Sequence, residues 1–150
     1  MRKLDKDINL IRRFNRRYVP AMQILDRTYL GTGLSAKEVT VLLEISENEG
    51  CSASDLTSWL KIDKGYLSRV LSRYERDGTI ERTPSKSDGR VLSITLTKKG
   101  ERMAALLAKQ GSRIVREAFR DASEADISSI AKSFTSILEL LEKNNCKKDG

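Results

Sequence analysis

The chain has 150 residues, of which 39% are hydrophobic and 33% charged, and its formal net charge is +7. This length suits one compact domain with a sizeable core, and the apolar content excludes a disordered tail. No apolar run approaches the roughly 20 residues that a membrane-spanning helix requires. The basic N-terminus lacks the apolar core and cleavage site of a signal peptide. We therefore expect a cytoplasmic protein with no membrane partner.

The residue types that are missing argue against the common enzyme classes. The sequence contains no His, and Cys51 and Cys146 are its only cysteines. Ser–His–Asp triads, Cys–His pairs and zinc-binding patterns are therefore absent, as are the Gly-rich loops of nucleotide-binding proteins. We expect no catalytic residue, no cofactor and no metal.

The basic residues are clustered rather than spread evenly. The net charge is +5 over residues 1–30, −4 over 31–60, +5 over 61–100 and +1 over 101–150. A clustered basic excess favours a polyanionic partner. The alternative is a basic surface that only keeps the protein soluble.

The N-terminal third is predicted to form two helices. Helical spacing of apolar residues indicates a first helix over 5–29, bent or broken at Pro20. Ser35 and Glu38 then have the spacing of a capping box, in which each side chain satisfies the other's free amide. The second helix follows and ends before Gly50. The residues on the apolar face of the first helix are Ile8, Ile11, Tyr18, Leu25 and Tyr29.

Two further helices follow in the middle of the chain. The first covers 52–60 and begins with a second possible capping box. The next is predicted at about 64–77, with Asp63 as its N-cap and Gly78 as a C-cap. Its apolar stripe has the spacing i, i+3, i+4, i+7 and consists of Leu67, Val70, Leu71 and Tyr74.

The only strand pattern of the chain comes next. Apolar and polar residues alternate over about 79–83 and 91–96, with Pro84 and "SKSDG" between the two runs, and this pattern predicts a hairpin. The residues expected on its inner face are Ile80, Leu92, Ile94 and Leu96.

The C-terminal third is predicted to form two long helices. Thr97 caps a helix over 98–120, and a last helix begins at Ser123. The apolar stripe of that helix is the most regular in the chain and is expected to be buried. It consists of Ile127, Ile130, Ala131, Phe134, Ile137, Leu138 and Leu141.

A short helix, a tight turn, a second helix and a hairpin together make a winged helix-turn-helix. We therefore expect a mainly α fold with a small β-hairpin wing. A helix fits the major groove of DNA when its inner stripe is apolar and its outer face is small, polar and basic. The basic hairpin tip suits an adjacent minor groove, where A·T-rich segments concentrate negative potential. The residues predicted to contact DNA are Lys64, Gly65, Tyr66, Ser68, Arg69, Ser72, Arg73, Lys86, Asp88 and Arg90.

For each of these residues the alternative is a solvated surface. Position and charge favour a DNA contact for Arg69 and Arg90. Tyr66 can equally pack on the N-terminus of its helix. Asp88 is expected to orient a basic side chain or the turn backbone, and Gly89 to allow the turn conformation.

Residues from about 35 to 143 resemble the MarR family of dimeric winged-helix transcription regulators. The matching pieces are "DLTSWLKIDKGYLSRVLSRYERDGTIER", "DGR" and "ITLTKKG". The family motif is an Asp-x-Arg wing that precedes a Leu-Thr pair and a helix-starting Lys/Gly segment, and its order is kept here. "DKGYLSR" also resembles the recognition helices of members fused to an acetyltransferase domain, which we expect to be absent. The positions that carry the motif are Asp88, Arg90, Leu96, Thr97 and Gly100.

The resemblance implies an obligate homodimer that binds a pseudo-palindromic DNA site. It divides the chain into an N-terminal dimerisation helix (1–34), a winged helix-turn-helix (35–97), C-terminal dimerisation helices (98–145) and a frayed tail (146–150). A small aromatic or anionic molecule bound between these regions often releases the DNA. The residues assigned to the dimer are Ile8, Ile11, Ile127, Ile130, Phe134, Ile137, Leu138 and Leu141.

The leading hypothesis is a sequence-specific transcriptional regulator, and more narrowly a repressor. A second hypothesis is a winged-helix module that binds proteins and has no specific DNA binding. Arg69, Arg73 and Arg90 argue against that second hypothesis. A third is an enzyme that uses only Asp, Glu or Ser.

Two features of the helical region have competing interpretations. Trp59 is expected to pack partly in the core, and the alternative is a place in the wall of a ligand pocket. Cys51 stands near Glu47 and Glu49, which discourage a thiolate and argue against a redox sensor.

A ligand cleft can be predicted only by neighbourhood. Residues near 11–29 and 102–116 are expected to line it. Arg13 or Arg17 could pair with a carboxylate there, although a solvated face or a contact with the DNA backbone is the preferred interpretation.

Overall fold

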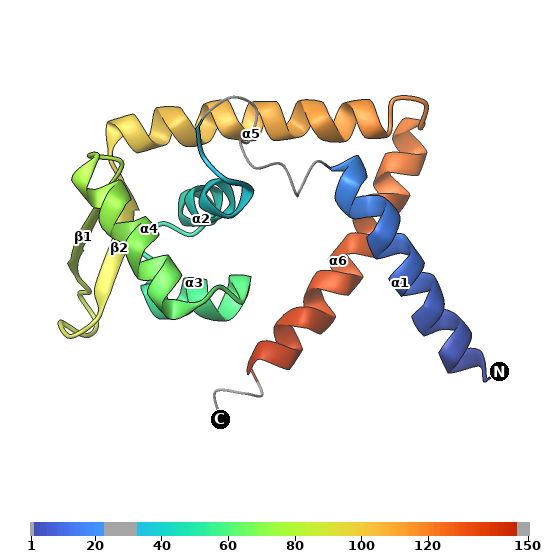
Figure 1. Cartoon of the computed structure of the whole chain (residues 1–150), viewed down its shortest axis with the longest axis horizontal. Coiled ribbons are helices and arrows are strands. Elements are labelled where there is room, and N and C mark those ends of the chain that lie inside the picture. The colour runs from blue at the N-terminus through green and yellow to red at the C-terminus, as the bar shows by residue number, and fades with distance from the viewer. Residues whose placement is uncertain (1, 23–32, 147–150) are drawn as a thin grey trace.

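The computed structural model describes residues 2–22 and 33–146. A lobe built from α2, α3, α4 and a hairpin lies at one end of the long helix α5, whereas α1 and α6 lie at its other end (Figure 1). The predicted mainly α fold with a β-hairpin wing is confirmed. The elements are α1 (Lys3–Ala21), α2 (Ala36–Glu47), α3 (Ala53–Leu60), α4 (Lys64–Arg76), β1 (Ile80–Pro84), β2 (Leu92–Leu96), α5 (Lys98–Ala118) and α6 (Glu124–Cys146).

The starts of the helices follow the capping signals in the sequence. Ser52 and Asp55 form the predicted reciprocal capping box of α3. Asp63 accepts a hydrogen bond from the backbone N–H of Tyr66 at the start of α4, with a distance of 2.9 Å. The C-terminus of α4 is followed by Gly78, whose φ of +73° suits glycine. Local chemistry therefore sets the length of the helix that carries most of the candidate site.

The hairpin contains a pairing that the sequence pattern did not predict. β1 and β2 are antiparallel, with Ile80 opposite Leu96 and Pro84 opposite Leu92. On the other side of β2, the N–H of Ile94 donates to the carbonyl of Cys51, and the distance is 2.8 Å. This single bridge fastens the segment between α2 and α3 to the wing, and one residue pair is too short to leave an alternating pattern.

The hydrophobic core lies in the winged-helix lobe and the adjoining part of α5. The predicted stripe of α4 is buried, as are Ile80 and Ile94 of the hairpin. Leu92 was expected to face inward but is largely exposed, because the outer end of the wing extends beyond the core. The buried apolar residues include Val39, Val41, Leu42, Ile45, Leu56, Leu67, Leu71, Tyr74, Ala104 and Leu107.

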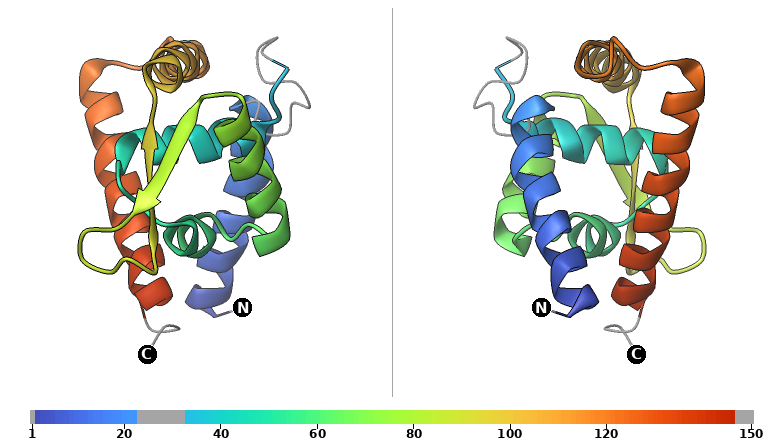
Figure 2. Two further views of the ribbon diagram at one scale, coloured as in Figure 1. Left: turned by 90° about the vertical axis from the view of Figure 1, so that its left-hand side faces the viewer. Right: turned by 90° about the vertical axis from the view of Figure 1, so that its right-hand side faces the viewer.

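The terminal helices do not bury their apolar faces within the chain. No residue of α1 is buried. The side chains of Ile127, Ile137, Leu138 and Leu141 in α6 have exposed fractions between 42 and 57%. The prediction that this stripe is buried is therefore wrong for these four residues, whereas the Phe134 ring packs against Phe14 and Tyr18 of α1, with ring centres 6.1 and 5.6 Å apart. In Figure 2 the two helices form one side of the molecule.

The boundaries of the terminal helices also differ from the prediction. α1 ends at Ala21, so Pro20 lies in its last turn and marks its end rather than a bend. The part of the predicted helix over 23–29 lies outside the described residues. α6 continues through Cys146, which was assigned to a frayed tail. None of the described helices combines the length and apolar character needed to cross a membrane.

The junction between the wing and α5 is unusually close. The backbone N–H and side-chain hydroxyl of Thr97 both donate to the carbonyl of Thr79, at 3.1 Å each. The same hydroxyl accepts a hydrogen bond from the N–H of Gly100. A Cβ atom at Gly100 would lie 2.1 Å from the Thr79 carbonyl oxygen, so only glycine fits at this position.

Gly100→Ala is expected to lower the free energy of unfolding by about 2–4 kcal/mol, because the backbone of β1 and α5 must separate to admit the methyl group. The intrinsic helix propensity of Ala acts in the opposite direction by up to about 1 kcal/mol. Chemical denaturation measures the difference. Gly89→Ala is the matched control, since a Cβ there meets no atom within 4 Å. Equal stability of the two variants would contradict the prediction.

Candidate nucleic-acid interface

Helix α4 presents a small, polar and basic face to solvent. This face consists of Gly65, Ser68, Arg69, Ser72 and Arg76, and all five are exposed. Because Gly65 and the two serines are short, the helix backbone can approach a flat or grooved partner closely, while the arginines reach further. The structure therefore brings four of the seven α4 residues that were predicted to contact DNA onto one surface, namely Gly65, Ser68, Arg69 and Ser72.

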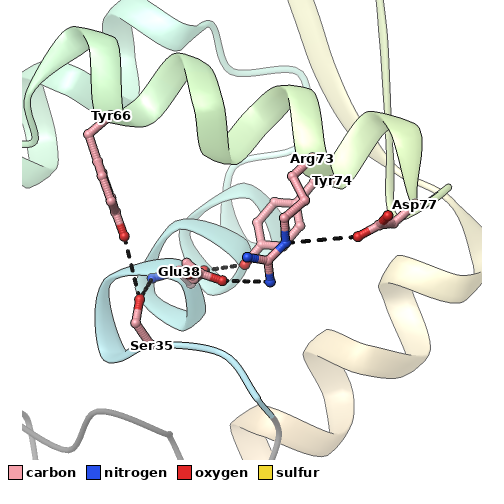
Figure 3. Close-up of polar contacts among 6 residues, drawn as sticks. All are labelled: Ser35, Glu38, Tyr66, Arg73, Tyr74 and Asp77. Carbon is pink, nitrogen blue, oxygen red and sulfur yellow. Dashed lines mark hydrogen bonds and ion pairs between the residues drawn. The ribbon is translucent and has the colours of Figure 1, made fainter.

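Hydrogen bonds to α2 hold the opposite side of α4 (Figure 3). The hydroxyl of the buried Tyr74 donates to the backbone carbonyl of Glu38, with a distance of 2.6 Å. Burial raises the pKa of this phenol, so the donor stays protonated. Nearer the start of α4, the hydroxyl of Tyr66 lies 3.5 Å from that of Ser35. These contacts and the buried stripe fix the rotation of α4 about its own axis.

Arg73 takes part in this anchoring. Its guanidinium lies 2.8 Å from the carboxylate of Glu38 and 3.9 Å from that of Asp77. The prediction that Arg73 contacts DNA remains untested, but in this conformation internal carboxylates occupy the side chain. The predicted capping box of α2 is only half formed, because Ser35 accepts the Glu38 N–H while the Glu38 side chain turns toward Arg73.

The wing tip carries an exposed arginine that its neighbour orients. The side chain of Arg90 is 92% exposed. One carboxylate oxygen of Asp88 accepts hydrogen bonds from the backbone N–H and the Nε of Arg90, at 3.1 and 3.3 Å. The prediction that Asp88 orients a basic side chain and the turn backbone is confirmed. Lys86 is exposed on the same tip. Gly89 does not have a positive φ, so its expected role in the turn conformation is wrong.

An ion pair joins the wing to α4. The guanidinium of Arg82 on β1 donates to both carboxylate oxygens of Glu75, with distances of 2.9 and 3.2 Å. These hydrogen bonds lower the pKa of Glu75, so the pair persists in mildly acidic solution. The wing and α4 are therefore linked by this surface ion pair as well as through the core.

A basic groove of about 490 Å³ runs between α3 and α4. Lys61, Lys64 and Arg82 contribute positive charge, and serine and threonine hydroxyls line much of the remainder. Lys61 forms the turn between the helices with a φ of +53°, which suits glycine better. The sequence analysis selected Lys64 and Ser68 here and missed Lys61 and the α3 residues, because the groove joins residues from four separate elements, α3, α4, β1 and α6. Its lining hydroxyls belong to Ser54, Thr57, Ser58 and Ser68.

A second basic residue missed by the sequence analysis lies on α2. The ammonium group of Lys37 lies 5.7 Å from the centre of the Tyr66 ring, and the guanidinium carbon of Arg69 lies 6.0 Å from the same centre. Lys37 is the only basic residue in the acidic segment 31–60. This isolated positive charge in an acidic segment is the sequence feature that could have drawn attention to Lys37.

An apolar cavity of about 290 Å³ lies between α1, α2 and α5. Tyr18 of α1 and Met22 just after it, with Gly111, Ile114 and Val115 from α5, lie within the two predicted neighbourhoods. Arg13 and Arg17, suggested as partners for a carboxylate, are not among the residues that line this cavity. The described lining carries no charged side chain, so the cavity suits an uncharged apolar molecule. Its remaining lining residues are Ala36, Val39, Thr40 and Leu43.

Trp59 belongs neither to the core cluster nor to the lining of the two cavities. Its exposed fraction is 40%, so the expectation of core packing is wrong. Leu56, three residues earlier on α3, fills the core position instead. In the described part of the chain, no group of acidic, His or Cys side chains is placed to hold a metal ion.

Cys51 lies in surroundings that suppress its reactivity. The thiol is buried, and its pKa is raised to about 11, mainly by burial and next by the negative charge of Asp55. Glu44 and Glu49 contribute in the same direction. The argument against a redox sensor is supported, although burial rather than neighbouring charge is the main cause.

Alkylation of Cys51 by iodoacetamide at pH 8 is expected to be at least a hundredfold slower in the folded protein than in the unfolded chain. At that pH the thiolate fraction falls from roughly a quarter, for an ordinary pKa of about 8.5, to about one in a thousand. Mass spectrometry of the Cys51 peptide measures the rate. Because the folded pKa is raised, the rate should increase as the pH approaches 11. Rapid modification at pH 8 would contradict this assignment.

The order of helices and the β-hairpin define a winged-helix fold. Its α4 and its wing both present basic residues to solvent. Residues 34–92 match the model of the MarR family, so the resemblance noted from the sequence is confirmed over this winged-helix segment. The match covers the helix-turn-helix and most of the wing. It does not extend to α5 or α6.

Two relatives show how far sequence similarity extends. The HTH-type transcriptional regulator BilQ of Clostridioides difficile is 37% identical over 60 residues, which cover 40% of each chain. The HTH-type transcriptional repressor Rv2887 of Mycobacterium tuberculosis is 33% identical over 86 residues, 57% of this chain and 59% of that protein. The chain spans 34 to 59% of the length of the curated relatives that it matches at 33–39% identity.

A solved structure shows that the fold is shared more widely than the sequence. A MarR-family regulator from Listeria monocytogenes, crystallised with a 26mer DNA, matches with a TM-score of 0.71 and 22% identity. The match covers all of this chain and 97% of the other. At this identity the likeness establishes the fold, including the placement of α5 and α6.

Proposed function

We propose that this protein is a sequence-specific DNA-binding transcriptional regulator. α4 enters the major groove, with Gly65, Ser68, Arg69 and Ser72 facing the bases and Lys64 reaching a phosphate. The observation that carries this proposal is the exposed face of α4, which is small, polar and basic and is held outward by the contacts of its other side with α2.

The wing completes the proposed interface. Arg90 enters the adjacent minor groove, where narrow A·T-rich segments attract an arginine, and Lys86 contacts the backbone. Asp88 acts through Arg90, whose guanidinium it holds. Tyr66 and Arg73 are proposed to position α4 rather than to read bases, because both contact α2.

The purified protein is expected to select a pseudo-palindromic sequence from a random DNA pool at about 0.15 M salt. Arg69→Ala should lose that preference, with a cost of about 1–3 kcal/mol if the side chain pairs with a base. Arg76→Ala, on the same helix but closer to its end, serves as the comparison. If a folded protein enriches no sequence, the proposal is wrong and a protein-binding module becomes the better interpretation.

We propose that the active form is a homodimer. The apolar residues on α1 and α6 are exposed in the single chain, and a contiguous exposed apolar surface marks an interaction site. A two-fold dimer also suits a palindromic operator, because protein and DNA then share their symmetry. In this proposal residues 1–34 and 98–145 form the dimerisation region, and Ile8, Ile11, Ile130, Phe134 and Leu141 contribute to it.

Leu138→Glu is expected to shift the protein from dimer to monomer at micromolar concentration, because it places a charge in the apolar interface. Analytical ultracentrifugation measures the change. Ser136→Glu is the control, since it adds the same charge on the opposite side of α6. Equal dimerisation of both variants would show that this stripe is not the interface.

Repression and control by an effector are finer parts of the proposal. A regulator that covers a promoter acts as a repressor, and four relatives carry that name. The cavity between α1, α2 and α5 suits an aromatic effector better than an anionic one, because its described lining carries no cation. The protein is proposed to act in the cytoplasm without catalytic activity.

A further inference from the structure

Lys37 stands at the edge of the proposed interface with a free charge. It is exposed, and no carboxylate of the described residues lies within ion-pair distance of its ammonium group. Within the described part of the chain, its ammonium group lies beside the Tyr66 ring, 5.7 Å from the ring centre. An exposed cation–π contact of this length contributes little to stability.

The position of Lys37 is unfavourable for its own helix. It is the second residue of α2, and the partial positive charge of a helix N-terminus destabilises a cation there. The same partial charge attracts an anion. The lysine and the helix N-terminus therefore both favour an anionic partner at this point.

Arg73 packs against α2 and Lys37 lies on α2, but of the two only Arg73 has carboxylate partners among the described residues. Glu38 and Asp77 neutralise Arg73, whereas Lys37 keeps its charge. The guanidinium of Arg69 lies 6.0 Å from the centre of the Tyr66 ring. The two distances to this ring place the charges of Lys37 and Arg69 no more than about 12 Å apart, so one DNA molecule whose major groove is about 12 Å wide can contact both.

We propose that Lys37 contacts a phosphate of the DNA strand that borders α4 on its α2 side. This inference rests on the proposed function. In the complex, Arg69 lies in the groove and Lys37 reaches the flanking backbone, while Tyr66 separates and supports the two side chains. α2 thereby becomes part of the DNA-binding surface, which the sequence analysis confined to α4 and the wing.

Lys37→Met tests the proposal, because it keeps the length of the side chain and removes its charge. Binding to the DNA sequence selected by the wild-type protein is measured between 0.05 and 0.3 M salt. At about 0.1 M salt the affinity should fall roughly threefold to tenfold, and the slope of log K against log salt should decrease by about one. The preference among DNA sequences should not change, because phosphates carry no base information.

Three further measurements separate this role from a structural one. Lys109→Met, on the side of α5 away from its buried residues, should bind as the wild type does. Lys37→Arg should restore both the affinity and the salt slope. The thermal stability of Lys37→Met should equal or slightly exceed that of the wild type, since an unfavourable charge has been removed from α2.

An unchanged affinity and salt slope in Lys37→Met would overturn the proposal, and Lys37 would then only pack on Tyr66. Arg69→Ala distinguishes this failure from failure of the proposed function. If Arg69→Ala still loses the selected sequence, DNA recognition stands without Lys37. If the wild type itself selects no sequence, both proposals are wrong.

Discussion

The packing of α4 against α2 is the constraint on which the candidate site depends. Leu67, Val70, Leu71 and Tyr74 bury one side of α4, and a helix that buries one side must expose the other. The Tyr74 hydroxyl and the Arg73 guanidinium then add directional contacts to Glu38. Apolar burial determines which side is outward, and the polar contacts determine by how many degrees it can turn.

Charge is divided between two tasks in this lobe. Arg73 and Arg82 are committed to carboxylates of the same chain, and they hold α4 to α2 and the wing to α4. Arg69 is free of ion pairs within the described residues, while Arg90 is held loosely by Asp88 and remains almost fully exposed. The net charge of the lobe does not show which arginines hold the structure together and which stay exposed. The ion-pair partner of each arginine does show this.

Local signals predicted the helices and the wing well. Asp63, the Ser52–Asp55 box and the stripe of α4 act over a few residues, so a single sequence contains them. The roles of Arg73, Lys37 and the Cys51 bridge depend on contacts between segments that are distant in the chain, and no spacing rule contains those. The stripe of α6 was recognised as apolar, but periodicity cannot tell whether the same chain or a second one covers it.

The uneven distribution of the core has a consequence for folding. The winged-helix lobe completes its core within one chain, whereas α1 buries none of its residues. An isolated helix of 19 residues is only marginally stable in water. In the proposed homodimer, protein concentration becomes a variable of the fold itself: on dilution the terminal helices are expected to lose the cover of the partner and fray, while the lobe keeps its structure. The proposal thus gives the chain two levels of cooperativity, one within a molecule and one between molecules.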